Sequence, residues 1–131
     1  MANTYTQIHI HTVFTVQNRD SIILKDWQDE LYRYITGIVQ NNKHKLLAIN
    51  GMPDRIHILI GLRPSQSLSD LIQDVKGNSS KWINEKKFVS DKFSWQEGYG
   101  AFSYAKSDNP ILIDYIQHQK EHHFCAELLK W

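Results

Sequence analysis

Two stretches of the chain alternate between polar and apolar residues, as strands with one buried face do. The first covers residues 5–16 and the second covers residues 55–62. The even-numbered apolar side chains are Ile8, Ile10, Phe14 and Val16 in the first stretch and Ile56, Ile58, Ile60 and Leu62 in the second. The polar side chains at odd positions are therefore expected on the opposite face. Further strands are predicted at 46–50 and, interrupted by two glycines, at 94–104.

Three other segments carry apolar residues at helical spacing. The first predicted helix covers residues 26–43, with Asp26 as its N-cap, and the second follows an N-cap at Ser67 or Ser69. The third starts near Pro110 and runs to about residue 129. This order predicts one α+β domain over residues 1–131, a ferredoxin-like split βαβ sandwich (βαββαβ) with an added C-terminal helix. Its first and third strands are central neighbours, and both amphipathic helices cover one face and leave the other open.

Composition limits the class of protein further. The chain has 131 residues, of which 41% are hydrophobic and 22% are charged, which is ordinary for one globular domain. Its formal net charge of +1 means that any contact with DNA must come from local patches. The single cysteine, Cys125, excludes an internal disulfide and a cysteine-based zinc site. The apolar runs are too short for a signal peptide or a membrane span, so a soluble cytoplasmic protein is expected.

The open face of the predicted sheet should collect the polar side chains of both central strands. Residues two apart on a strand point the same way, which places His9 and His11 beside Arg55 and His57. Neutral imidazoles suit a divalent ion, although histidines on such a face can equally be ordinary solvated polar residues. In the last predicted helix, Tyr115 lies four residues before Gln119, so the two share one helical face.

Five segments, in order along nearly the whole chain, resemble the HUH-superfamily single-tyrosine transposases of the smallest bacterial insertion sequences and the similar REP-associated tyrosine transposases. Residues 52–60 resemble the Met-Pro-Asp-His-hydrophobic-His-Leu-Leu stretch of that family. Residues 93–103 resemble its Trp-Gln-x-Gly-Tyr segment, and 115–123 resemble its tyrosine helix. The first strand with the following Asn18-Arg19 also fits, as does the segment at 76–84.

This resemblance implies a defined chemistry. Tyr115 would attack a phosphodiester of single-stranded DNA, leaving a 5′-phosphotyrosine and a free 3′-hydroxyl, and the strands could then be rejoined without ATP. Mg²⁺ or Mn²⁺ would polarise the phosphate, with His57 and Gln119 as ligands. The substrate would carry a hairpin, and the protein would be a homodimer with each site built from two chains. The residues implied in DNA binding are Arg19, Arg55, Lys76, Ser79, Ser80 and Lys81.

Arg55 departs from the family pattern, which has histidine at this position. Arginine stays protonated and offers only donors, so it cannot be a metal ligand. Three explanations are open: cleavage is lost while DNA binding survives, Arg55 contacts the phosphate directly, or His9 or His11 replaces the missing ligand. The sequence thus predicts either an active transposase or a relative that binds structured single-stranded DNA without cutting it. A ferredoxin-like RNA-binding or small-ligand domain ranks last, because the central strands offer no exposed aromatic residues.

Overall fold

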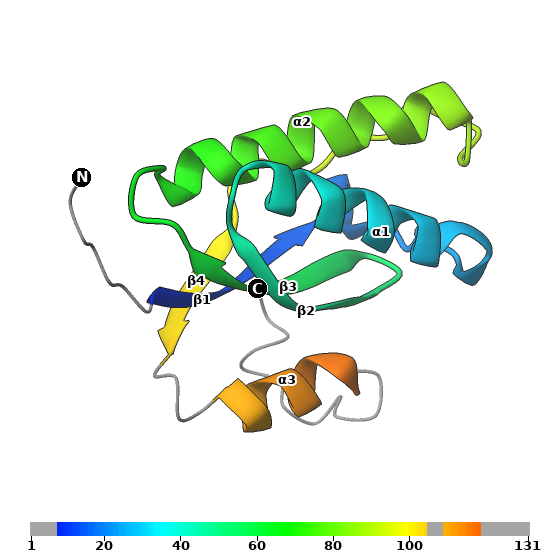
Figure 1. Ribbon diagram of the computed structural model, residues 1–131. Helices are drawn as coiled ribbons and strands as arrows, with labels where there is room; N and C mark the ends of the chain where they lie inside the picture. Colours follow the sequence, from blue (N-terminus) through cyan, green and yellow to red (C-terminus); the bar gives the residue numbers. More distant parts are fainter. Residues whose placement is uncertain (1–7, 105–108, 119–131) are drawn as a thin grey trace.

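The computed structural model describes residues 8–104 and 109–118 (Figure 1). Strand β1 (Ile8–Thr15) leads through the short 3-10 helix η1 (Gln17–Arg19) to helix α1 (Lys25–Asn41). Strands β2 (Lys45–Met52) and β3 (Arg55–Leu62) form a hairpin, and helix α2 (Leu68–Lys86) follows. Strand β4 (Gly100–Tyr104) and helix α3 (Asn109–Gln117) complete the described part. None of the helices in these ranges is long and apolar enough to cross a lipid bilayer.

The four strands form one antiparallel sheet in the order β2-β3-β1-β4. Strands β1 and β3 are central neighbours, as predicted, and their register places Val13 opposite His57 and His11 opposite Leu59. The predicted strand at 94–104 is shorter in the structure, because regular pairing begins only at Gly100. Ahead of it, a single bridge joins Trp95 to Val16 at the end of β1.

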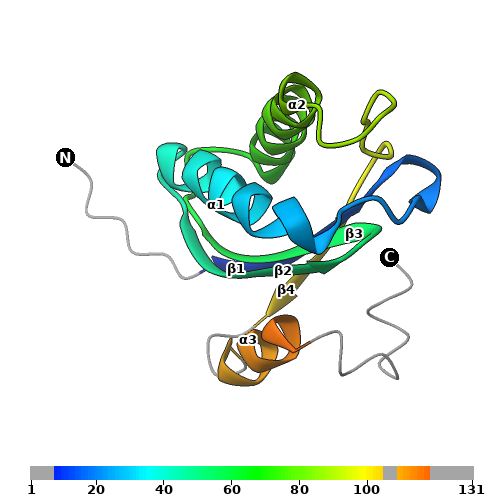
Figure 2. The same cartoon turned by 90° about the vertical axis from the view of Figure 1, so that its right-hand side faces the viewer.

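Helices α1 and α2 cover one face of the sheet, where the even-numbered side chains of β1 and β3 form the main core (Figure 2). Phe14, Ile56 and Ile58 are fully buried there against apolar residues of both helices. The N-cap of α2 is Ser67, whose hydroxyl accepts a hydrogen bond from the backbone N–H of Asp70. Asp26 is not the N-cap of α1, because the helix starts one residue earlier and Asp26 lies in its first turn.

The prediction that the second face stays open is wrong. Helix α3 lies across that face, on the side of the sheet opposite α1 and α2 (Figure 2). Tyr115 and Ile116 of α3 pack on Ala48 and Leu59 and form a second, smaller apolar cluster. Helix α3 covers β2 and β3 on this face, and the polar side chains His11 and His57 of the two central strands are both 0% exposed.

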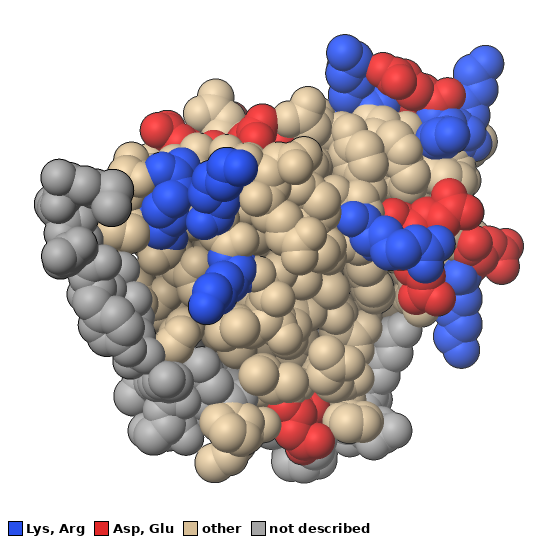
Figure 3. All heavy atoms as spheres, viewed as in Figure 1, with Lys and Arg blue, Asp and Glu red and all other residues tan. Residues whose placement is uncertain are grey.

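Charged side chains are distributed unevenly over the surface. On the face shown in Figure 3, lysines and arginines alternate with acidic residues at the right-hand side, whereas the left-hand side carries cations with few acidic neighbours. This group lies where α1 leads into β2. A small net charge therefore does not prevent a local cationic patch.

Candidate active site

A pair of buried histidines lies at the centre of the α3-covered face. His11 of β1 and His57 of β3 sit diagonally across the strand pair, and the Nε2 of His11 lies 2.8 Å from the Nδ1 of His57. Their ring centroids are 5.0 Å apart and the rings are inclined by 29°. The distance is that of a good hydrogen bond. The predicted gathering of histidines on this face is thus confirmed for these two residues.

Both histidines are held in the neutral form. Burial lowers the pKa of His11 from its ordinary value of 6.5 to about 4. Burial also lowers the pKa of His57 to about 3, with smaller contributions from His11 and from the cationic Arg55. A neutral imidazole keeps a lone pair on one nitrogen, which is the form that can bind a metal ion.

The tyrosine helix α3 lies over strands β2 and β3, beside this pair of histidines. Tyr115 contacts Ala48 and Leu59, which face each other across β2 and β3. Two positions along the same strands, Asn50 stands opposite His57, and its side-chain amide donates a 2.8 Å hydrogen bond to the carbonyl oxygen of Gln117. Helix α3 therefore runs from the level of Leu59 to the level of His57. Tyr115 is 9% exposed, so its hydroxyl is largely shielded from solvent.

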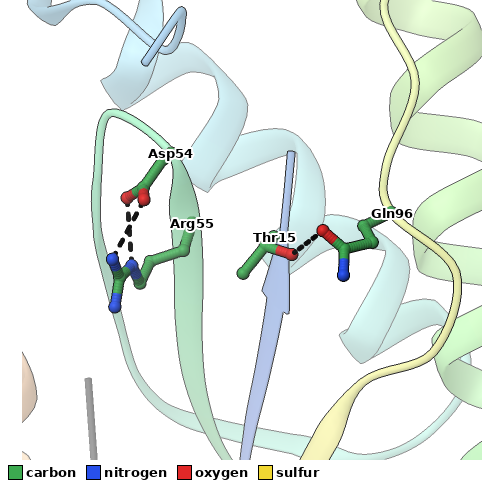
Figure 4. Close-up of polar contacts among 4 residues, drawn as sticks. All are labelled: Thr15, Asp54, Arg55 and Gln96. Atoms are coloured by element: carbon green, nitrogen blue, oxygen red, sulfur yellow. Dashed lines mark hydrogen bonds and ion pairs between the residues drawn. The ribbon is translucent and has the colours of Figure 1, made fainter. Parts of the chain in front are cut away.

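Arg55 occupies the first position of β3 and pairs with its neighbour Asp54. The guanidinium donates to both carboxylate oxygens, with distances of 3.0 Å from Nε and 2.9 Å from Nη2 (Figure 4). Both side chains are only about one-sixth exposed, at 15% and 16%. The two-pronged contact offsets the positive charge of Arg55, which lowers the electrostatic cost of placing a cation nearby.

The segment that follows α2 is fastened beside Arg55. Thr15 is the cross-strand partner of Arg55, and its backbone carbonyl accepts a 2.8 Å hydrogen bond from the N–H of Gln96. The hydroxyl of Thr15 also lies 3.4 Å from Oε1 of Gln96 (Figure 4). Gln96 belongs to the segment that resembles the family pattern, so the structure brings that segment to the edge of the candidate site.

The ligands expected for a divalent ion are partly present. The Nε2 of His57 is buried and makes no hydrogen bond within the described parts of the chain, which fits a nitrogen reserved for a metal ion. Residues 8–104 and 109–118 contain no cluster of three or more His, Cys, Asp or Glu side chains that could hold an ion. The predicted ligand Gln119 falls outside the described residues. His9 is half-buried. It lies two residues before His11 on β1 and therefore on the same face of the sheet.

Two residues expected to contact DNA have structural partners instead. The ammonium of Lys76 donates to the carbonyl oxygens of Gln96 and Gly98, at 2.6 and 2.8 Å. Partial burial lowers the pKa of Lys76, while Glu97 acts in the opposite direction. Ser79 is fully buried, and its hydroxyl accepts a 2.9 Å hydrogen bond from Nε1 of Trp95. Lys76 and Ser79 thus tie the segment at 95–98 to α2, so we do not retain them as DNA contacts.

The other expected DNA contacts lie nearer the surface. Arg19 is exposed and adopts a left-handed backbone conformation, with φ of 56°. Lys81 is also exposed and is 4.0 Å from Glu85, a spacing that contributes little to stability at a solvated site. Ser80 is half-buried and donates a hydrogen bond to the carbonyl of Gly77.

A cationic cluster that sequence reasoning missed lies where α1 leads into β2, beside the residue that follows β3. Lys43 and Lys45 are exposed on either side of the buried His44, whose Nδ1 accepts a 2.8 Å hydrogen bond from the backbone N–H of Arg63. Arg63 is half-buried, and its Nε donates to the carbonyl of Asn42. These contacts bring Arg63 beside the segment that carries Lys43 and Lys45, so the three cations form one cluster. The sequence did not reveal this cluster, because Arg63 follows β3 whereas Lys43 and Lys45 lie where α1 joins β2.

Comparison with known proteins agrees with this arrangement. The chain matches the family model "Transposase IS200 like" over residues 4–119. It is 23% identical over 124 residues to the ISDra2 transposase TnpA of Deinococcus radiodurans, covering 88% of this chain and 87% of that protein. The fold superposes on a crystal structure of a candidate transposase from the same organism with a TM-score of 0.74, at 19% identity and with 91% and 95% of the two chains covered.

A second solved structure, a REP-associated tyrosine transposase bound to a REP hairpin, has a TM-score of 0.69 at 16% identity. The match covers 94% of this chain and 73% of that one. At these identities the two solved structures support the fold, whereas the family model spans most of the chain. The chain described here therefore belongs to the IS200-like DNA transposases, single-tyrosine members of the HUH superfamily.

Proposed function

We propose that this transposase cuts and rejoins single-stranded DNA through a covalent intermediate on Tyr115. The phenolic oxygen of Tyr115 attacks the phosphorus of a phosphodiester, and the bond from phosphorus to the 3′-oxygen breaks. The tyrosine gives up its proton, the leaving 3′-oxygen takes one up, and a 5′-phosphotyrosine remains. Attack of another 3′-hydroxyl on this phosphotyrosine releases the tyrosine and joins the strands.

The placement of Tyr115 is the observation that carries this proposal. A tyrosine on an isolated helix would be an ordinary packing residue, but α3 places Tyr115 against Leu59, which is paired with His11 and lies two residues after His57 on β3. His57 supplies a buried imidazole nitrogen without a hydrogen-bond partner among the described residues. The nucleophile and a potential metal ligand thus share one face of the sheet.

A divalent cation is part of the proposal. Single-tyrosine transposases of this family generally use one, and bound Mg²⁺ or Mn²⁺ would polarise the scissile phosphate. His57 and, one turn after Tyr115, Gln119 are the proposed protein ligands. Because Arg55 cannot be a ligand, phosphate oxygens of the DNA and water would supply more of the coordination sphere than in a site with two histidines.

DNA can reach this site only if α3 moves. His57 is 0% exposed and Tyr115 is 9% exposed, so no phosphodiester can approach them in the described arrangement. Among the described residues, α3 is held on the sheet by the small apolar cluster around Leu59 and by the hydrogen bond from Asn50 to Gln117. We propose that DNA binding displaces α3, which in a homodimer could then offer Tyr115 to the partner's site.

We propose that the cluster of Lys43, Lys45 and Arg63 binds the phosphate backbone of a DNA hairpin. The related REP-associated transposase was solved with such a hairpin. Replacing Lys43 and Lys45 together by glutamine removes two phosphate contacts. The plot of log K for DNA association against log salt concentration should therefore become shallower, by about 2 in the magnitude of its slope. Fluorescence anisotropy with a hairpin from the DNA flanking the gene, at several salt concentrations, measures this slope. The same double change at Lys86 and Lys87, both exposed at the end of α2, is the control and should leave it unaltered.

A second function is favoured by one observation, the ion pair between Arg55 and Asp54. Arg55 stands where the family pattern has a metal-ligand histidine, and its guanidinium binds Asp54 and cannot bind a metal ion. In that case the protein would bind structured single-stranded DNA without cutting it.

One experiment separates these functions. Labelled single-stranded DNA from the flanks of the gene is incubated with the protein and Mn²⁺ or Mg²⁺, and denaturing gels reveal any covalent adduct. Wild-type adduct supports the active transposase and shows that Arg55 is tolerated. If Arg55→His yields at least ten times more adduct than the wild type, the wild-type site lacks a metal ligand but is otherwise intact. A hairpin shift in native gels without adduct from either protein supports the binding function.

A further inference from the structure

We propose that His11 is a positioning residue that fixes the tautomer and orientation of His57, so that the Nε2 lone pair of His57 is available to a divalent ion. The proposal rests on the function proposed above, since it assigns a role within the same site. It differs from the expectation that His11 replaces a missing ligand, because here His11 acts through His57 and does not touch the metal.

The hydrogen bond between the two rings needs one proton donor. If His11 donates from Nε2, then His57 accepts at Nδ1 and must carry its own proton on Nε2. If His57 donates from Nδ1, then its Nε2 carries a lone pair. Only the second arrangement permits a metal ion at Nε2 of His57, because a protonated nitrogen cannot coordinate.

Each arrangement leaves one ring N–H outside the bond between the two histidines. It is the Nε2–H of His57 in the first arrangement and the Nδ1–H of His11 in the second, and both nitrogens are buried. Metal binding selects the second arrangement, because only that one presents a lone pair at Nε2 of His57, a nitrogen without a hydrogen-bond partner within the described residues. His57 is therefore assigned as the donor and His11 as the acceptor when the metal ion is bound.

The fold holds this pair firmly. His11 is paired through the backbone with Leu59 of β3 on one side and with Phe102 of β4 on the other, so the ring stands on one of the two inner strands of the sheet. Phe102 also packs beside the His11 ring, with centroids 6.0 Å apart. Both imidazoles are fully buried, and water does not compete for their hydrogen bond. Such outer partners of metal-binding histidines typically change metal affinity 10–100-fold when they are removed.

Nitrogen NMR of the histidine rings in the Mg²⁺-loaded protein tests the assignment directly. The ¹⁵N shifts distinguish a ring protonated at Nδ1 from one protonated at Nε2, and His57 is expected to carry its proton on Nδ1. His44 is an internal reference for the other tautomer, because its Nδ1 accepts from the backbone N–H of Arg63. A proton on Nε2 of His57 would overturn the proposal. This measurement needs neither DNA nor cleavage, so its result is independent of whether the proposed function holds.

Metal affinity provides the second readout. His11→Gln keeps an acceptor near the position of the imidazole Nε2, whereas His11→Phe fills the space without one. Titration calorimetry with Mn²⁺ should show a 10–100-fold weaker Kd for His11→Phe, and His11→Gln should recover most of it. His44→Gln is the control for changing a buried histidine. Equal Mn²⁺ affinity in all the variants would contradict a positioning role. The same large loss of Mn²⁺ affinity in both His11 variants would also contradict it and would make His11 a metal ligand. If His11→Phe does not fold, the wild-type spectrum and His11→Gln still decide.

Discussion

Replacing Tyr115 by phenylalanine is expected to abolish the covalent adduct with single-stranded DNA, by about three orders of magnitude or more. The phenol oxygen is the atom that forms the bond to phosphorus in the proposed mechanism, and phenylalanine has no atom that can replace it. The ring packs on Ala48 and Leu59, and phenylalanine preserves those contacts. Hairpin affinity in native gels and the melting temperature should therefore change little. Denaturing gels with labelled DNA and Mn²⁺ measure the loss.

Tyr99→Phe is the matched control for this change. Its hydroxyl also makes a described contact, a 2.8 Å hydrogen bond with the hydroxyl of Ser69, but it lies on the helix face of the sheet beside α2. This variant should form adduct at the wild-type rate. If Tyr115→Phe still forms adduct, another residue is the nucleophile and the proposed mechanism is wrong.

The largest effect on stability is expected for Trp95→Ala, with a loss of about 3–5 kcal/mol in the free energy of unfolding. The indole is 9% exposed and packs edge-on against both Phe14 and Phe93, with centroid distances of 4.8 Å to each. Its Nε1 also donates a hydrogen bond to the hydroxyl of Ser79, which fastens the segment after α2 to that helix. Urea denaturation followed by far-ultraviolet circular dichroism measures the loss. A change below about 1 kcal/mol would show that this segment is not part of the cooperative core.

Ser79 can be tested in the same way. Ser79→Ala leaves the buried indole N–H of Trp95 without its acceptor, which should cost about 1–3 kcal/mol. In the double variant with Trp95→Phe this cost should largely disappear, because phenylalanine has no N–H to satisfy. Hairpin binding should be unchanged in folded Ser79→Ala.

The sequence was sufficient to predict the sheet and the side chains that each of its two faces carries. Alternation along 55–62 placed Ile56 and Ile58 toward the core and His57 on the opposite face, because side chains on a strand alternate without exception in a regular ladder. The resemblance of five segments in order along the chain correctly indicated the family. The extent of burial on the second face could not be read in this way. It depends on α3 docking there, and a few apolar residues in a nine-residue helix do not specify which surface they will cover.

The roles of individual polar residues were harder to predict, for a physical reason. The α2 stripe Ile72, Val75 and Ile83 has helical spacing, and Ser79 falls within it, which was a signal that Ser79 would be buried. Lys76 gave no such signal, because its acceptors are backbone carbonyls of a loop twenty residues later. The pairing of Arg55 with Asp54 depends on rotamers at a turn, which residue type alone does not fix. Local patterns thus predict faces, but contacts between distant segments need the assembled fold.

The strand order also has a consequence for how the newly made chain reaches its native state. The hairpin of β2 and β3 joins neighbours in sequence and can form early, whereas β1 obtains its second partner only when His9 meets Tyr104. Closing so long a loop is entropically costly and slow. During synthesis on the ribosome, one edge of β1 stays unpaired until nearly the whole domain has emerged. The first strand made is then among the last to be completed, and that exposed edge is the point at which a chaperone would have the longest opportunity to bind.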